Sequence, residues 1–265
     1  MLSKSSKNIS SIFIINLHES KDRRSYMEVL CQQHGLHPIF IKAVVGKSLT
    51  TSDIDSCSNH YRAENLFGRK LLLGELGCAL SHKKIYQKII NDNIPHALIL
   101  EDDITISDNI HKAIDGIEEC FVPWELVLLG HHKDITRGIS SPISIWDKHD
   151  ITSKFTLNRL ASFGFGTYGY LISKEGARKL LDELDTIYQP IDHYTSDSNI
   201  INVYALCPPI ISVNTNFETL IDNNNVRQKN NDRLSVILLK KIGVINIAIK
   251  TKSFLKKIKP IKRYK

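Results

Sequence analysis

The segment from His96 to Ile104 constrains the fold of this chain more than any other. An apolar run ends abruptly at three consecutive acids, Glu101, Asp102 and Asp103, before the apolar pattern resumes. The run is typical of a buried strand, so the acids are expected at its carboxyl end. Carboxylates crowded at a sheet rim repel one another and lose hydration, which favours a compensating divalent cation. We therefore predict a metal-diphosphate site here; a solvated corner between strand and turn is the alternative.

Length and composition are those of an ordinary globular chain. The 265 residues, 42% of them hydrophobic, suffice for a substantial core in one large domain or two small ones. Five scattered cysteines without a CxxC pair indicate neither a disulfide framework nor a zinc site, and they fit a reducing cytoplasm. The N-terminal segment lacks the apolar core of a signal peptide, and we expect no membrane-spanning segment.

The net charge of +7 is concentrated in a tail. Residues 240–265 hold ten of the 35 Lys and Arg residues and no Asp or Glu, so the remainder carries a net charge of −3. This distribution does not indicate nucleic-acid binding. Apolar residues in 234–249 follow a helical stripe, which predicts a basic amphipathic tail over 226–265. Such a tail suits an anionic membrane surface; a terminal helix docked on its own domain is the alternative.

The N-terminal region reads as a strand, a turn and a helix. Residues 11–17 form an apolar run that predicts a buried strand, and a helix is expected from Ser20 to about His34. Asn16 lies at the carboxyl end of the strand, where open parallel sheets bind ligands, and Arg23 and Arg24 follow. Basic residues in a first helical turn oppose the helix dipole, which favours an anionic partner such as phosphate; ordinary exposed arginines are the alternative.

Other segments have clear patterns as well. Residues 37–41, 125–129 and 168–173 predict strands, and residues 75–91 have the apolar spacing of a helix that leads directly into the acidic strand. Residues 47–70 have no assignable pattern. The adjacent Ser and His at positions 81 and 82 are weak evidence for nucleophilic catalysis, because neighbouring residues in a helix do not face one another.

A glycine-rich motif at residues 164–169 satisfies the GxGxxG pattern. It precedes a predicted strand instead of joining a strand to a helix, so a dinucleotide site is not indicated. We expect these glycines to shape a loop in which Phe163, Phe165 and Tyr168 present flat apolar faces to a ligand.

Six segments together carry a family resemblance. In chain order they read IFIINLHESKDRR, KAVVG, LLLGELGCALSHKKIY, ALILEDD, TYGYLISKEGA and QPIDH. In this order and at these separations they resemble glycosyltransferase family 25, the bacterial lipopolysaccharide and lipooligosaccharide sugar transferases, over roughly residues 10–215. Val45 departs from the family pattern, which usually has Asp or Asn before this glycine, so that side chain's contact is absent or supplied elsewhere.

The resemblance implies an α/β catalytic domain over residues 1–225, of the Rossmann-like GT-A type, with a mixed, mostly parallel sheet between helices. It implies an inverting transferase that moves a hexose from a UDP-sugar to a terminal sugar of a lipooligosaccharide or lipopolysaccharide. UDP-galactose is the first expected donor and UDP-glucose the second. The expected location is the cytoplasmic face of the bacterial inner membrane, where the acceptor lipid and the basic tail meet.

The same resemblance assigns roles to single residues. Mn²⁺ or Mg²⁺ is expected on Asp103 with Glu101, which also faces the ribose, and Asp102 beside them belongs to the expected catalytic set. Asp192, expected in a short loop, is the candidate base that deprotonates the acceptor hydroxyl; capping of the next helix is its alternative role, and His193 is an alternative metal ligand. The remaining expected substrate-binding residues are Asn16, Ala43 and Gly46 for the nucleoside, Arg23 or Arg24 for the diphosphate, and Glu75, Ser81 and His82 for the sugars.

Two other classes of protein stay open at this point. A nucleotidyltransferase can use the same scaffold and acids, but it normally has a glycine-rich loop after the first strand, and residues 16–24 contain no glycine. A non-catalytic carbohydrate-binding protein would need no metal-diphosphate site. Metal-dependent binding of UDP distinguishes the transferase from this last alternative.

Overall fold

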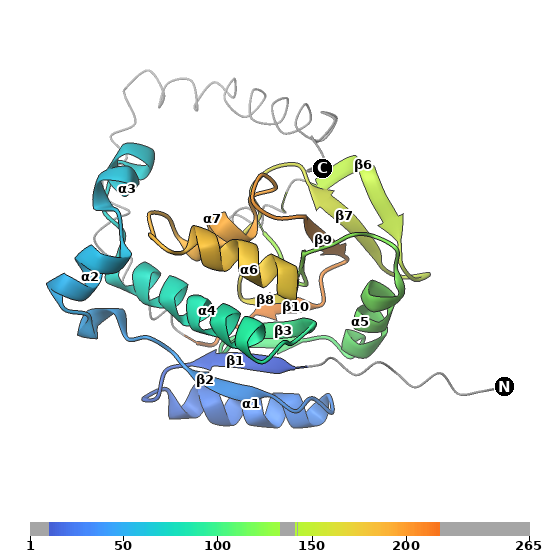
Figure 1. The fold of residues 1–265 in the computed structure, drawn as a ribbon. Coiled ribbons are helices and arrows are strands. Elements are labelled where there is room, and N and C mark those ends of the chain that lie inside the picture. Colours follow the sequence, from blue (N-terminus) through green and yellow to red (C-terminus); the bar gives the residue numbers. More distant parts are fainter. Residues whose placement is uncertain (1–10, 133–140, 142, 218–265) are drawn as a thin grey trace, which may run out of the picture.

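An eight-stranded mixed sheet forms the centre of the protein in a computed structural model, which describes residues 11–132, 141 and 143–217 (Figure 1). In spatial order its strands are β2 (Ile39–Lys42), β1 (Ile12–Asn16), β3 (His96–Glu101), β8 (Gly169–Ser173), β5 (Leu126–Leu128), β9 (Val203–Cys207), β7 (Thr156–Leu160) and β6 (Ile143–Asp150). Six of these eight described strands run in one direction, whereas β7 and β8 run against them. The predicted mixed, mostly parallel sheet is confirmed, while the predicted basic tail lies outside the described residues.

Helices cover both faces of this sheet. Residues of α4, α6 and α7 build the core on one face, and residues of α1 and α5 build the core on the other. Figure 1 shows α1 on one side of the sheet and α4 with α6 on the opposite side. The described helices are α1 (Lys21–Gln33), the 3₁₀ helix η1 (Gly46–Ser48), α2 (Thr51–Cys57), α3 (His60–Phe67), α4 (Leu73–Asn91), α5 (Ile110–Glu119), α6 (Lys174–Glu183) and α7 (Ile191–Thr195).

Strand β1 illustrates why an uninterrupted apolar run forms a strand in this protein. Phe13 and Ile15 belong to the same core as residues of α4 and α6, whereas Ile12 and Ile14 belong to the core with α1 and α5. Both faces of the strand are therefore covered, as is usual inside a parallel sheet. The predicted strand and the helix after it are confirmed, although Ser20 at the N-cap position of α1 makes no side-chain capping hydrogen bond.

The acidic triplet lies where the chain leaves the main sheet. Glu101 is the last residue of β3, and after Asp102 and Asp103 the chain continues into β4 (Ile104–Ile106). Strand β4 pairs with β10 (Ile211–Val213) in a separate two-stranded antiparallel sheet. The acids therefore occupy the break between two sheets, at the carboxyl ends of β1 and β3, where open α/β sheets bind their ligands.

Residues 47–70, which have no clear sequence pattern, form most of η1 and the short helices α2 and α3. Their ends are set by local hydrogen bonds instead of by an apolar stripe. Thr50 and Asp53 form a capping box at the start of α2, and the Asn59 side chain caps α3. Helix α3 ends at Phe67 and is followed by Gly68, whose φ of 70° is accessible to glycine without strain.

The remaining predicted elements are also found. The expected strands near 37–41, 125–129 and 168–173 correspond to β2, β5 and β8, and the helix near 75–91 corresponds to α4. Within the described ranges, every helix is too short or too polar to cross a membrane.

Two glycines allow η1 to pack directly against the backbone of α4. A Cβ atom added at Gly46 would lie 1.8 Å from the carbonyl oxygen of Leu73, and one added at Gly77 would lie 2.6 Å from the carbonyl oxygen of Val44. Ser81 joins the same segments, because its Oγ donates to the Gly77 carbonyl (2.6 Å) and accepts from the Val44 amide (2.8 Å). This close approach brings η1 against the start of α4.

We predict that Gly77→Ala destabilises the protein despite its position in a helix. Alanine is favoured over glycine in a helix by roughly 1 kcal/mol, but overpacking costs about 1–3 kcal/mol, and the obstacles here are backbone atoms, so we expect a cost at the upper end and a net loss of about 1–2 kcal/mol. Urea unfolding measures this change, with the exposed Lys84→Ala in the same helix as the control. Equal stability of the Gly77 variant and the parent would show that η1 can move away.

Candidate active site

A cavity of about 530 Å³ opens at the carboxyl ends of β1 and β3, beside η1 and the start of α4. The cavity is lined by apolar residues of these elements and by seven residues that the sequence analysis placed at a ligand site. Those expected residues are Arg23, Ala43, Gly46, Ser81, Glu101, Asp102 and Asp103. Asn16 adjoins the cavity, because its Nδ2 donates to Asp102 Oδ2 at 2.7 Å.

Arg23 supplies a positive charge in direct contact with the acidic triplet. Its Nη1 atom lies 2.8 Å from Asp102 Oδ1 and 3.0 Å from Asp103 Oδ2, and all three side chains are largely buried. Asp102 therefore accepts hydrogen bonds on both oxygens, one from Arg23 and one from Asn16. This geometry suits a supporting role for Asp102 instead of the catalytic role expected from the sequence, since neither oxygen is left without a donor.

Glu101 and Asp103 are the two carboxylates of the triplet whose pKa values are raised. Burial raises the pKa of Glu101 to about 8, repulsion from Asp192 and Asp102 adds to the effect, and Arg23 opposes it. Burial also raises the pKa of Asp103 to about 6, with further repulsion from Glu101. Acids from β3 and α7 therefore lie close enough to interact, and their negative charge exceeds what Arg23 compensates.

Asp192 lies in the first turn of α7, and the prediction of a short loop here is wrong. Helix α7 begins after Pro190, whose φ of −59° suits a helix start, and buried Ile191 anchors it in the core. Asp192 Oδ1 accepts hydrogen bonds from the backbone amides of Gly166 (3.2 Å) and Thr167 (3.0 Å) and from the Thr167 hydroxyl. Asp192 thus holds the loop before β8 and does not cap its own helix, while no described residue donates to its Oδ2.

His82 is buried with one ring nitrogen unused. Its Nδ1 lies 2.8 Å from the hydroxyl of Tyr170, which is 2.7 Å from that of Tyr86, whereas Nε2 has no hydrogen-bond partner among the described residues. Burial lowers the pKa of His82 to about 4, so the ring is neutral at pH 7 and its 3.9 Å approach to Glu101 is not an ion pair. Cys78, one helical turn earlier, completes a group of ligand atoms within 4.8 Å of one another.

The residues at this edge fit a divalent cation. Glu101 and Asp103 offer carboxylate oxygens, the ligands that Mg²⁺ and Mn²⁺ prefer, and a cation would relieve the crowding that raises both pKa values. One or two carboxylates suffice, since Mg²⁺ usually keeps water and substrate phosphates as its other ligands. Cys78 was not predicted as a possible metal ligand from the sequence. Its spacing of four residues from His82, which places both on one face of a helix, is the signal that could have found it.

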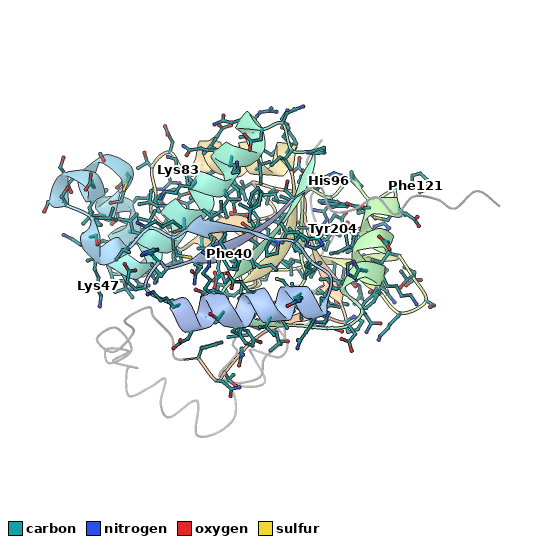
Figure 2. All side chains as sticks on the ribbon, turned by 90° about the horizontal axis from the view of Figure 1, so that it is seen from below. Phe40, Lys47, Lys83, His96, Phe121 and Tyr204 are labelled. Carbon is teal, nitrogen blue, oxygen red and sulfur yellow. The ribbon has the colours of Figure 1, made fainter. Side chains whose placement is uncertain are left out.

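Asn16, Arg24, Glu75, His82 and Asp192 are not among the residues that line the cavity, and of these Arg24 and Glu75 pair with other side chains. Arg24 points away from it, because its Nε pairs with Glu28 (2.9 Å) and its guanidinium stacks 4.2 Å from the ring centre of Phe40, labelled in Figure 2. Glu75 binds the guanidinium of Arg69 through both oxygens, at 2.6 and 2.7 Å, and closes the first turn of α4. Of the two arginines expected at a diphosphate, only Arg23 lines the cavity, and the expected contact of Glu75 with a sugar stays a prediction.

An aromatic group lies next to Asp192. The ring of His193 is 5.2 Å from Phe67, 5.2 Å from Phe163 and 5.5 Å from Phe165, measured between ring centres. Phe163 is 41% exposed, so part of its face is open to solvent. Burial lowers the pKa of His193, which keeps the ring neutral among these apolar neighbours. The loop before β8 thus joins an acidic site to an aromatic surface.

These features define an α/β protein with an acidic, ligand-sized cavity at the carboxyl ends of its parallel strands. The family model described as "Glycosyltransferase family 25 (LPS biosynthesis protein)" matches residues 9–195, and the chain belongs to this family.

Several known proteins are similar in sequence. Human procollagen galactosyltransferase 2 is 29% identical over 182 residues, which is 64% of this chain and 27% of that protein. A glycosyltransferase 25 family member of Aedes aegypti is 29% identical over 72% of this chain and 31% of its own length. The chain spans less than a third of the length of these curated relatives. The solved structure of A197 from STIV covers 74% of this chain and 80% of its own, at 12% identity and a TM-score of 0.37.

We predict that Glu101→Gln stabilises the metal-free protein, and more so as pH rises. A carboxyl whose folded-state pKa is raised from 4.5 to about 8 destabilises the folded state progressively between these values. The Glu101 side chain is 32% exposed, so we discount the effect for solvent screening and expect about 1–2 kcal/mol at pH 8 and little below pH 5. Urea unfolding in chelator at both pH values measures it, with exposed Asp108→Asn as the control. A pH-independent difference would contradict the assignment.

Proposed function

We propose that this chain transfers a hexose from a UDP-sugar to a saccharide acceptor with inversion at the anomeric carbon. The observation that carries the proposal is the approach of Asp192, from a distant part of the sequence, to Glu101 and to Cys78 at the cavity that Glu101 and Asp103 line. Membership of glycosyltransferase family 25 and relatives named as galactosyltransferases support it. A GT-A type of fold is part of the same proposal.

The cavity is the proposed donor site. Ala43 and Gly46 line the proposed nucleoside end of the cavity, and Glu101, which also lines it, is assigned to the ribose or the cation. Arg23 reaches the cavity from α1 and offers guanidinium N–H groups to a diphosphate. Asp103 with Glu101 holds the divalent cation. A bound Mn²⁺ or Mg²⁺ supplies positive charge where the diphosphate departs.

Asp192 is the proposed general base. Its Oδ1 is fixed by Gly166 and Thr167, which leaves Oδ2 for the acceptor hydroxyl. As the acceptor oxygen attacks the anomeric carbon, its proton passes to Asp192, the bond from that carbon to the diphosphate oxygen breaks, and UDP leaves. Tight anchoring of one carboxylate oxygen orients the other, and this is the structural argument for catalysis over simple helix capping.

The acceptor side is assigned to the aromatic group of Phe67, Phe163, Phe165 and His193. These flat rings lie beside Asp192 and give the apolar face of a pyranose a surface to pack on. Galactose is the proposed donated hexose, because relatives carry galactosyltransferase names, and glucose is the alternative. A terminal sugar of a bacterial lipooligosaccharide or lipopolysaccharide is the proposed acceptor, in keeping with the description of the family.

We predict that Asp103→Ala abolishes sugar transfer with the fold intact by circular dichroism, because the cation loses its principal ligand. The assay offers UDP-galactose, UDP-glucose and other UDP-sugars with lactose, glucose and galactose glycosides as acceptors, with Mn²⁺ and with chelator. We expect metal-dependent consumption of one UDP-hexose by the parent and by Asp108→Ala, whose aspartate is exposed. Near-normal turnover by Asp103→Ala would exclude the metal assignment, and UDP binding without turnover would favour a carbohydrate-binding or nucleotidyltransferase role.

For Asp192→Asn, we predict a 10²- to 10⁴-fold loss of transfer, the usual contribution of a positioned base. Binding of UDP with Mn²⁺ should be retained, because the asparagine oxygen can still accept the hydrogen bonds of Gly166 and Thr167. Asp197→Asn is the matched control on the same segment, since within the described ranges the Asp197 side chain hydrogen-bonds only to its neighbour Asn199. Loss of UDP binding in the Asp192 variant would move this residue to the nucleotide site.

The basic region over 226–265 is the proposed membrane contact, which would place the enzyme on the cytoplasmic face of the inner membrane. Truncation after Asn231 is expected to release the protein from anionic vesicles without stopping transfer to a soluble acceptor. Vesicle flotation measures the first effect and the UDP-sugar assay the second. Unchanged flotation of the truncated chain would show that this region packs elsewhere.

A further inference from the structure

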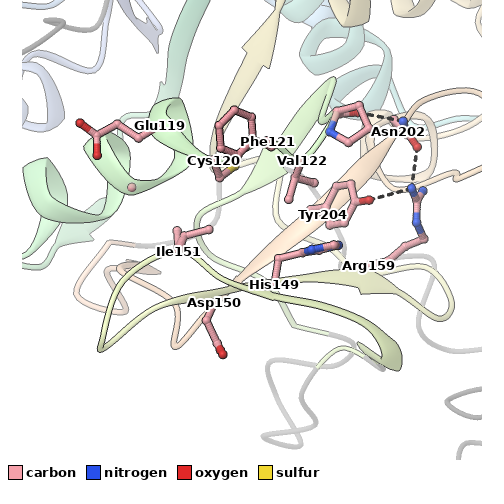
Figure 3. A pocket seen from close by; sticks show the side chains of 12 residues that line it. Glu119, Cys120, Phe121, Val122, His149, Asp150, Ile151, Arg159, Asn202 and Tyr204 are labelled. Atoms are coloured by element: carbon pink, nitrogen blue, oxygen red, sulfur yellow. Dashed lines mark hydrogen bonds between the residues drawn. The ribbon is translucent and has the colours of Figure 1, made fainter.

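A second cavity, of about 670 Å³, lies on the half of the sheet away from the acidic site (Figure 3). The end of α5 and the loop after it form one wall, the end of β6 forms another, and residues of β7 and β9 lie between them. It shares no lining residue with the donor cavity. Figure 2 shows Lys47, which lines the donor cavity, and Phe121, which lines the second cavity, on opposite sides of the molecule.

A buried polar network forms part of this cavity. Arg159 is only 3% exposed, yet it lines the space. Its Nε donates to Asp147 (2.9 Å), and its Nη2 donates to Asn202 (2.7 Å) and to the Tyr204 hydroxyl (2.9 Å). Figure 3 shows the last two bonds as dashed lines. Nη1 makes no hydrogen bond to any residue in the described part of the chain, so a fixed guanidinium with an unused edge belongs to the cavity.

The charges of the cavity do not favour an anion. The charge of Arg159 is already matched by Asp147, and the cavity is also lined by the carboxylates Glu119 and Asp150. A phosphate or carboxylate would meet more negative than positive charge here. His149, whose Nε2 is 2.7 Å from Asp147, adds a ring nitrogen, Nδ1, on its other side. The cavity thus offers both hydrogen-bond donors and acceptors without a net positive field.

A fully exposed aromatic ring adjoins the apolar side of the cavity. Phe121 has no protection from solvent, with a relative exposure of 104%, and Val122 and Pro123 continue the same wall. Exposure of a complete aromatic face is costly in water and is common where a ligand packs against it. Hydroxyl groups, which donate and accept, match the polar side of the cavity, and C–H groups of a sugar ring match the phenyl face.

We propose that this cavity is a second, non-catalytic saccharide site that binds one or two neutral sugar units. The choice of a saccharide over another neutral polar ligand rests on the proposed glycosyl transfer. A glycan acceptor extends beyond its reacting sugar, and a second contact on the same chain raises the effective concentration of that acceptor at the donor cavity.

The test is an NMR chemical-shift titration of the ¹⁵N-labelled full-length chain. The probes are lactose, N-acetyllactosamine and maltose, with inorganic phosphate as the anionic probe, all without UDP-sugar or divalent cation. We expect shifts of the amides of residues 119–122 and 149–151 with at least one neutral saccharide. Phe121→Ala and His149→Ala should each weaken this binding at least tenfold, whereas Tyr61→Ala, which removes another largely exposed ring, on α3, should leave it unchanged.

The same titration separates the two proposals. Asp192→Asn should bind saccharide at the second cavity like the parent, because its substitution is in the other site. If saccharide shifts these amide resonances but no UDP-sugar is consumed, the proposed transfer is overturned and the second site is supported. Turnover without shifts at these residues, undiminished binding in Phe121→Ala, or binding of phosphate in place of saccharide would each overturn the second site.

Discussion

The contact of Arg23 with Asp102 and Asp103 is the interaction on which the acidic edge depends. Two neighbouring carboxylates at the end of a buried strand would repel each other, and removal of one partner from such a pair leaves an uncompensated charge that costs about 3–5 kcal/mol when it is buried. Arg23 is placed by the packing of α1, because Met27 and Cys31 on the same face of the helix are in the core. The hydrophobic packing of α1 therefore positions the Arg23 guanidinium at the site.

The contact with Arg23 gives the three acids of the triplet different surroundings. Asp102 has both oxygens occupied by Asn16 and Arg23, which ties the ends of β1 and β3 to α1. Asp103 accepts a hydrogen bond from the same Nη1 atom of Arg23 through one oxygen, Oδ2. Glu101 makes no hydrogen bond to Arg23. The site therefore keeps one acid for structure and two acids with raised pKa values for a ligand that brings positive charge. Three adjacent residues of one chemical type acquire different roles through their surroundings alone.

Much of the fold was predictable, and the failures have identifiable causes. Strands covered on both faces and the long helix α4 have strong apolar patterns, whereas α2 and α3 are short and set by caps, so their apolar pattern was too weak to assign. The distinction between Arg23 and Arg24 was present in the sequence. Arg23 precedes Met27 by four residues and Cys31 by eight, so the three share the buried face of α1, while Arg24 is rotated about 100° away.

The location of Asp192 could not be predicted in this way, because it depends on strand direction. Strand β8 runs antiparallel to β3, with Gly169 opposite Leu100, so β8 begins at the edge where β3 ends. The loop before β8 therefore reaches the acidic edge, and its Thr167 holds Asp192 there. A parallel strand in the same position would present its carboxyl end at this edge and send that loop to the opposite one. The reversal of one strand is thus the reason that an acid from α7 can meet the acids of β3.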